Sequence, residues 1–526
     1  MCETRNIPRD ELIEACDKLR AEGFDFLIDL CGAHYPGRAN EEFEVVYHLM
    51  NLKSRTRLRL KVAVPEADAV IPSVTGIWKA ANWFERESFD MFGVRFSGHP
   101  NLKRLLMFEE FEGHPLRKDY PIGKRQKIPV PDPLYTGDGD GYNFVNFGPS
   151  HPSTHGAFRL MLKLDGERIA DAIPEIGYLH RCFEKESEDH TYTQVIPYTD
   201  RLNYCSCLMN NVGYCLAVEK LLKIEIPERA QYIRILISEL SRIIDHLVAI
   251  GANLVDMGAL TNFWYTFNIR ELVYDWIEKL CGARLTTTYT RIGGVARDIP
   301  ADTKKYIPAT LKKLDRAVKD VTGLLLKNRI YLDRTVGVGV LSREDAISYG
   351  WTGPCARASG VDYDARREFP YYGYDKLDWE VPLGENGDTY DRIMVRFEEI
   401  RQSARIVEQV LEKMPDGPIM TDQYKVALPE KANVYGSIEG LMDHFKLIMD
   451  GITPPKGEVY SFTEAANGEL GFYIVSDGSK NPYRIKVRPP CYVVYQAYPD
   501  MIKGHMIADA VAILGSLNVI AGELDR

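Results

Sequence analysis

The chain has 526 residues, of which 45% are hydrophobic and 27% are charged, and its formal net charge is −10. A chain of this length usually forms two or three domains, and its negative charge argues against nucleic acid as the main partner. No apolar run approaches the roughly 18 residues that span a bilayer, and the first residues lack the apolar core of a signal peptide. We therefore expect a cytoplasmic protein that reaches a membrane only through partners.

The N-terminal region alternates between helical and strand patterns. Apolar residues at helical spacing predict an amphipathic helix at 11–22, and three strands are expected at 24–32, 43–51 and 56–65. Residues 83–121, which are dense in Glu, Arg, His and aromatic side chains, predict a packed helix followed by a charged loop. We assign residues 1–121 to a small α/β domain.

Prolines, glycines and charged residues dominate residues 122–141, which end in Gly-Asp-Gly-Asp-Gly. Such a segment cannot propagate a helix or a central strand, so we interpret it as a linker. The second domain is then residues 142–526.

The second domain begins with a loop, GPSHPSTHG at residues 148–156, that lies between two strand-like segments. Pro152 excludes a helical arrangement of His151 and His155 and favours extended backbone at His151. The loop is followed by an alternating run at 158–164, after which Asp165-Gly166 predicts a type I′ hairpin turn. Histidines at the tip of such a rigid hairpin are placed where binding and proton chemistry often reside, although a histidine there is more often an ordinary surface residue.

The rest of the second domain is mostly helical. Apolar residues three and four apart predict a long core helix at 227–251, and further helices are expected at 261–280, 302–328, 391–414 and 505–516. The aromatic, acidic and turn-rich segment 357–392 is too long for a plain connection and is typical of a binding surface. The fold class is therefore α+β, with a small N-terminal α/β domain followed by a mostly helical domain that opens with a β-hairpin sheet.

The ten cysteines are scattered, with no CxxC pair. Cys205 and Cys207 are the closest two, and no further Cys or His follows at the spacing of a metal clip. We therefore expect no metal bound by this chain.

Several motifs carry a resemblance to one family. GPSHPSTHG, GYLHRCFEK at 177–185, PYTDRLNY at 197–204 and the C-terminal ELDR resemble the D subunit (49 kDa type) of complex I, the respiratory NADH-quinone oxidoreductase. The stretch 83–121, with its EGHPLRKDYP, resembles the C subunit (30 kDa type) of the same complex. The resemblance implies a fused C/D subunit that forms the quinone-reduction chamber, beside an iron–sulfur cluster held by the B subunit.

The resemblance also implies site residues. His155 and Tyr204 match the residues that hydrogen-bond the quinone headgroup, and Asp256 matches the carboxylate that pairs with the histidine; these three are the expected catalytic residues. His151 lies in the same loop, whereas Arg181 and Thr286 match positions beside the partner's cluster. Quinone is the expected substrate, and the expected partners are the B and I subunits and the membrane-embedded H and A subunits, on the cytoplasmic side of the bacterial plasma membrane.

Thr286 departs from the family's pattern, because many members have a histidine at this position. Threonine cannot titrate near neutral pH. A cluster without that proton acceptor should have a low potential, so we expect menaquinone rather than ubiquinone.

Two other interpretations remain open. The large subunits of [NiFe] hydrogenases share the fold family, but they need four cysteine thiolates from an early and a late CxxC pair, which this chain lacks. A related ferredoxin- or F420-linked complex would use different donor subunits. The other alternative is a scaffold without chemistry of its own, which the intact His155, Tyr204 and Asp256 disfavour.

Overall fold

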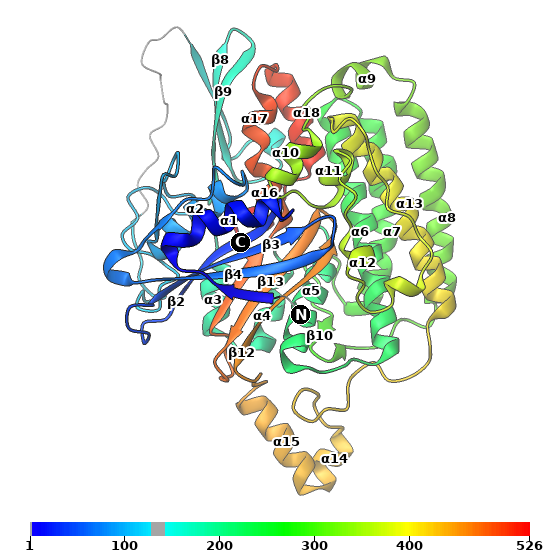
Figure 1. Ribbon diagram of the computed structural model, residues 1–526. Coiled ribbons are helices and arrows are strands. Elements are labelled where there is room, and N and C mark those ends of the chain that lie inside the picture. The colour runs from blue at the N-terminus through cyan, green and yellow to red at the C-terminus, as the bar shows by residue number, and fades with distance from the viewer. Residues whose placement is uncertain (1–2, 128–141) are drawn as a thin grey trace.

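The computed structural model describes residues 3–127 and 142–526 (Figure 1). Its N-terminal part is a four-stranded sheet of order β1-β4-β3-β2, in which β1 runs parallel to β4 and the other pairs are antiparallel. Helix α1 (Leu12–Ala21) buries Leu12, Cys16 and Leu19 in the same core as the sheet, as the predicted amphipathic pattern requires. The strands are β1 (Glu3–Asn6), β2 (Phe26–His34), β3 (Phe43–Asn51) and β4 (Thr56–Val64).

The charged stretch after this sheet begins with helix α2 (Ala81–Phe92), which packs on β2. Asp90 on this helix is fully buried, and its carboxylate accepts the backbone N–H groups of residues 105–107 at 2.9–3.0 Å. The predicted helix followed by a folded-back charged loop is thus confirmed. A short parallel pair, β5 (Val70–Pro72) and β6 (Arg95–Ser97), flanks the helix. Most of the expected linker, residues 128–141, lies outside the described residues.

The loop of the two histidines belongs to an antiparallel sheet, β7 (Asn143–Phe147), β8 (Arg159–Asp165) and β9 (Arg168–Glu175), as predicted. The turn differs from the prediction. Asp165 pairs with Arg168, so the two turn residues are Gly166 and Glu167, and only Gly166 has a positive φ, of 60°. A positive φ at the first turn residue alone is the pattern of a type II′ turn, which favours glycine there.

Helices form most of the second part. The central helix α6 (Glu228–Asp256) is buried along nearly its whole length and packs against α7 (Leu260–Cys281) and α13 (Thr389–Lys413). The five predicted helices are all present, but α6 continues past the predicted end at residue 251, so Asp256 is its last residue. The other long helices are α5 (Cys207–Leu222), α8 (Thr303–Leu325) and α18 (Ile507–Leu517). The shorter helices are α3 (Phe183–Asp189), α4 (Tyr192–Thr199), α9 (Arg329–Thr335), α10 (Arg343–Ser348), α11 (Gly353–Ala358), α12 (Ala365–Glu368), α16 (Pro490–Gln496), α17 (Tyr498–Ile502) and α19 (Ala521–Asp525).

A third sheet, β12 (Gly457–Ala465), β13 (Gly468–Ser476) and β14 (Arg484–Arg488), lies between the N-terminal sheet and the helices (Figure 1). Its three strands were not predicted from the sequence. Ion pairs join this sheet to the N-terminal one: Arg57 meets the buried Glu469 at 2.6 Å, and Lys61 meets the partly exposed Glu458 at 2.6 Å. The two parts of the chain therefore share a charged interface rather than only a linker.

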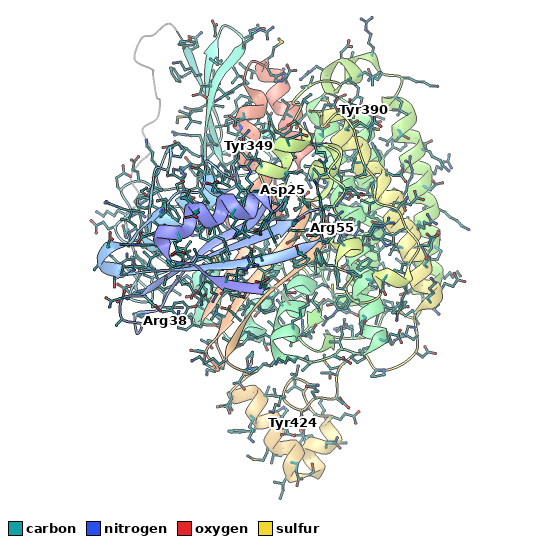
Figure 2. The ribbon with its side chains drawn as sticks, viewed as in Figure 1. Asp25, Arg38, Arg55, Tyr349, Tyr390 and Tyr424 are labelled. Atoms are coloured by element: carbon teal, nitrogen blue, oxygen red, sulfur yellow. The ribbon has the colours of Figure 1, made fainter. Side chains whose placement is uncertain are left out.

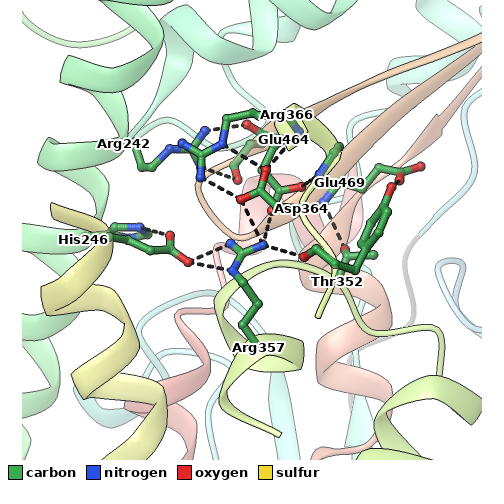
Figure 3. Close-up of polar contacts among 12 residues, drawn as sticks. Arg242, His246, Thr352, Arg357, Asp364, Arg366, Glu464 and Glu469 are labelled. Carbon is green, nitrogen blue, oxygen red and sulfur yellow. Dashed lines mark hydrogen bonds and ion pairs between the residues drawn. The ribbon is translucent and has the colours of Figure 1, made fainter. Parts of the chain in front are cut away.

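The turn-rich segment 357–392 contains both exposed residues and a set of buried charges. Arg357 is fully buried and donates to Glu399 at 2.7 Å and to Glu464 at 2.8 Å, while Arg366 pairs with Asp364 at 2.7 Å (Figure 3). Buried charges persist only when paired and hydrogen-bonded. Part of the segment's charge is therefore a core network, whereas most of its acidic side chains are exposed: Asp362, Asp375, Asp378, Glu380 and Glu385.

Candidate quinone site

His155 and Asp256 are brought together from distant positions in the second part. A short 3-10 turn, η3 (Pro152–Thr154), separates the two loop histidines, with His151 extended before it and His155 left-handed after it at φ 56°. The Nε2 atom of His155 lies 2.6 Å from Oδ2 of Asp256 at the end of α6. The oxygen is buried, and the two atoms lie within hydrogen-bonding distance although no described donor is well aligned on that oxygen.

His151 occupies a different environment from His155. Its side chain is exposed, its Nδ1 accepts the N–H of Ser153 at 3.2 Å, and its ring packs on Phe147 with centroids 4.8 Å apart. No carboxylate pairs with it among the residues the structure describes. Of the two histidines, only His155 has the carboxylate partner that the resemblance implied.

Tyr204 lies on the loop between α4 and α5, partly buried against the core that includes the hairpin sheet. Burial raises the pKa of Tyr204 to about 12, and Cys205, Cys491 and Asp245 add to this effect. Its phenol oxygen has no hydrogen-bond partner in the described parts of the chain, so the hydroxyl is a protonated donor that is free to bind a ligand.

The base of the Tyr204 loop is held by amides. Asn203 donates to Asp245 at 2.7 Å, and Asn518 donates to the other oxygen of the same carboxylate at 2.6 Å. All three side chains are buried. A carboxylate with both oxygens occupied by fixed donors holds the backbone beside Tyr204 in place.

The C-terminal helix α19 connects the site loops. A Cβ added at Gly156 would lie 2.7 Å from the Cβ of Ala521, and one at Gly522 would lie 2.6 Å from the carbonyl oxygen of Arg201. The next loop is tied to the same helix, since Asp525 accepts the N–H of Leu179 at 2.8 Å. The loops of His155, Arg181 and Tyr204 therefore meet at α19, a role that the ELDR motif by itself did not reveal.

Arg181 forms hydrogen bonds where the site loops meet α19. Its guanidinium donates to the carbonyl oxygens of Arg201 at 2.8 Å and Gly522 at 3.1 Å, and burial lowers its pKa. Its backbone N–H donates to the carbonyl of Arg526 at 3.0 Å.

Thr286 lies in a segment that packs beside the start of α5. Its φ is 51°, which is rare for a β-branched residue. The following residue, Thr287, contacts the sulfur of Cys207 at 3.1 Å. This segment thus adjoins the same part of the chain as Tyr204, although Thr286 itself makes no hydrogen bond or ion pair with the other site residues within the described ranges.

One buried cysteine has a carboxylate neighbour. Cys491 contacts Glu523 at 3.2 Å, and burial raises the pKa of that carboxyl to about 7. Across residues 3–127 and 142–526, no three His, Cys, Asp or Glu side chains are grouped so that they could hold a metal ion. In the same ranges no helix is both long and apolar enough to cross a membrane.

Comparison with known proteins agrees with this architecture. The family described as respiratory-chain NADH dehydrogenase, 30 Kd subunit, matches residues 5–126, and the 49 Kd subunit family matches residues 256–526. The C/D subunit of NADH-quinone oxidoreductase from Bdellovibrio bacteriovorus is 53% identical over 99% of this chain and 94% of its own length. The corresponding C/D subunit from Pseudomonas paraeruginosa is 41% identical over 99% of this chain and 92% of its own length.

A shorter relative covers only the second part. The D subunit of the same enzyme from Myxococcus xanthus is 52% identical over 73% of this chain and 92% of its own length. The separate D subunit and the longer C/D relatives together account for both parts of the chain. The chain therefore belongs to the fused C/D subunits of NADH-quinone oxidoreductase, complex I.

Proposed function

We propose that this chain supplies the residues that hydrogen-bond and protonate the quinone in complex I. The observation that carries the proposal is the 2.6 Å contact between His155 and Asp256, together with the packing of the His155 and Tyr204 loops on the same helix, α19. Reduction of a quinone to a quinol takes two electrons and two protons, so donors are needed at both carbonyl oxygens. A histidine and a tyrosine supply two such donors.

Each residue has a defined part in this proposal. Asp256 orients the imidazole of His155, so that a ring N–H faces one carbonyl oxygen of the quinone. Tyr204 donates to the other, and its pKa of about 12 keeps the hydroxyl protonated across the physiological range. His151, at the exposed edge of the same loop, contacts the headgroup without transferring a proton.

Electrons and partners come from other chains in this proposal. The B subunit's iron–sulfur cluster lies beside Arg181 and Thr286 and reduces the quinone, and the I, H and A subunits complete the chamber. The chain is peripheral on the cytoplasmic side of the bacterial plasma membrane and contributes to proton translocation only in the assembled complex. The domain boundaries that we propose are 1–121, 122–141 and 142–526.

Purification of the native complex tests this assignment most directly. Mass spectrometry should identify B, I, H and A subunits and a bound quinone together with this chain. Co-purification with hydrogenase or F420-linked subunits, and without a quinone, would contradict the proposal.

An exposed apolar arm supports docking to another protein of the complex. Helices α14 (Lys431–Gly436) and α15 (Ile438–Met449) project from the body, and Figure 2 labels Tyr424 on the same projection. Ile438, Phe445 and Ile448 are 77%, 57% and 60% exposed. A contiguous apolar surface of this kind is typical of a protein interface.

We expect the double substitution Phe445→Glu and Ile448→Glu to prevent assembly of the complex while the isolated chain still folds. Loss of a buried interface anchor costs about 2 kcal/mol or more, roughly thirtyfold in affinity. The measurement is the yield of co-purified subunits. Ile330→Glu, at a residue that is 69% exposed on α9, is the matched control. Normal assembly of the double variant would show that the arm is not an interface.

Thr286 gives a prediction about the partner's cluster. With threonine there, the cluster's midpoint potential should be low and nearly independent of pH, which suits menaquinone. Thr286→His should raise the potential and introduce a slope approaching about 59 mV per pH unit. The backbone at φ 51° accommodates histidine, a residue enriched in the left-handed region.

The check on Thr286 is an EPR redox titration of the cluster at pH 6 and pH 8 in the native complex and in Thr286→His. Thr286→Asn, which fits the same backbone and does not titrate, is the control. A full slope in the native complex, or no change with histidine, would show that this interpretation is wrong.

A further inference from the structure

A large cavity lies away from the quinone site, at the seam between the N-terminal sheet and the second part of the chain. Its volume is about 910 Å³, within the range of sites that hold drug-sized ligands. One wall comes from β4 and the preceding turn, where Figure 2 labels Arg55. The other walls come from α5, the segment 368–372 and β12, and Glu3, Ile28, His48 and Leu49 on β1–β3 complete the lining.

The cavity is lined by aromatic rings whose hydroxyl groups are already engaged. The Tyr371 oxygen accepts the N–H of Glu464 at 3.3 Å, and that of Tyr372 accepts from Arg234 at 2.6 Å. Tyr460 donates to Glu469 at 3.2 Å. These tyrosines, with Phe369 and Phe462, therefore offer ring surface rather than polar groups to a ligand.

The cationic groups that line the cavity are paired except for one. Arg55 meets Glu368 at 3.0 Å, and Arg57 meets Glu469 at 2.6 Å. Lys220 on α5 has no hydrogen-bond or ion-pair partner among the described residues, although its ammonium lies 5.9 Å from the centroid of Phe462. The guanidinium of Arg57 covers the same ring at 3.5 Å.

Lys220 is an exposed side chain that lines the cavity, so water reaches it while the cavity is empty, although the surrounding protein displaces part of that water. Burial lowers the pKa of Lys220, and the positive charge of Arg57 lowers it further. An anion bound in the cavity would provide the counter-charge that the protein itself does not supply.

We propose that this cavity binds a small aromatic monoanion, with its carboxylate on Lys220 and its ring against Phe369, Phe462 and the neighbouring tyrosines. A polyanion such as a nucleotide is disfavoured because the other two lining arginines are already neutralised. A neutral ligand is disfavoured because it would displace water from the ammonium of Lys220 without supplying a counter-charge.

The test measures binding of naphthalene-2-carboxylate to the purified native complex by calorimetry, with naphthalene-2-carboxamide as the neutral analogue and dodecanoate as the aliphatic one. The carboxylate should bind more tightly than either. Lys220→Met should weaken it about tenfold or more and leave the carboxamide unchanged, whereas Lys220→Arg should retain binding. Lys313→Met, at an exposed lysine on α8, is the matched control.

These experiments measure ligand binding and not quinone reduction, so failure of this proposal can be distinguished from failure of the proposed function. Absence of carboxylate binding, or an equal loss in Lys220→Met and Lys313→Met, would overturn the proposal. Equal or tighter binding of dodecanoate would overturn the aromatic class. Binding to the isolated full chain but not to the complex would show that a neighbouring protein fills the cavity, which also contradicts a ligand site.

Discussion

Tyr204→Phe is expected to lower the rate of quinone reduction about tenfold to a hundredfold without affecting assembly. The substitution removes only the hydroxyl, which has no partner within the described residues, so the fold loses no hydrogen bond. A donor to an oxygen that develops charge contributes about 1.5 to 3 kcal/mol, which corresponds to that loss in rate. The measurement is quinone reductase activity in membranes with verified assembly, together with EPR of the iron–sulfur clusters, which should still be reduced.

The two loop histidines provide the companion test. His155→Ala should cause a loss of similar size, because it removes the partner of Asp256 at 2.6 Å. His151→Ala should change the rate less than about threefold, since that side chain is exposed and has no carboxylate partner within the described residues. Tyr390→Phe, on α13, is the control: it removes a phenol oxygen outside the candidate site and should leave the rate unchanged. Unchanged turnover in both Tyr204→Phe and His155→Ala would favour the scaffold alternative.

Arg357→Met is expected to give the largest loss of stability, about 3 to 5 kcal/mol in the free energy of unfolding. The side chain is fully buried and donates to both Glu399 and Glu464 (Figure 3). Methionine fills a similar space but leaves two buried carboxylates with too little compensating charge. The measurement is urea unfolding of the full chain, and Arg401→Met, at a partly exposed pair on the same helix as Glu399, should change stability by less than about 1 kcal/mol.

The effect of Arg357→Met should depend on pH. Burial alone would raise the pKa of Glu399, but Arg357 and then His246 hold it well below its usual range. In the wild-type chain this carboxylate therefore contributes stability above the ordinary carboxyl pKa, and that contribution is lost only as pH falls through the lowered value. Without Arg357 the pKa rises and protonation relieves the unpaired charge, so the destabilisation should be smaller at pH 5 than at pH 8. Equal losses at both pH values would show that the missing charge is not the cause.

The local patterns of the sequence determined most of the long helices and most strands of the N-terminal sheet and the hairpin sheet, and the motifs nominated the candidate site residues. Spacings of three and four located all five predicted long helices, and the alternation at 158–164 located β8, because these periods reflect which face of each element is buried. Pro152 determined that His151 is extended, since its ring restricts the preceding residue. The motifs around His155, Tyr204 and the C-terminus determined the family.

Only the tertiary structure decided how these residues meet. The contact between His155 and Asp256 joins residues 101 positions apart in the sequence, and it depends on α6 continuing five residues beyond its apolar pattern. The segment 357–392 has the composition of a surface loop, yet Arg357 and Arg366 are core residues because carboxylates on α6, α13 and β12 neutralise them. Local sequence records the polarity of a side chain, whereas burial of a charge depends on a counter-charge that a distant segment supplies. For the same reason the seam cavity and the unpaired Lys220 could be found only after the two parts of the chain were packed together.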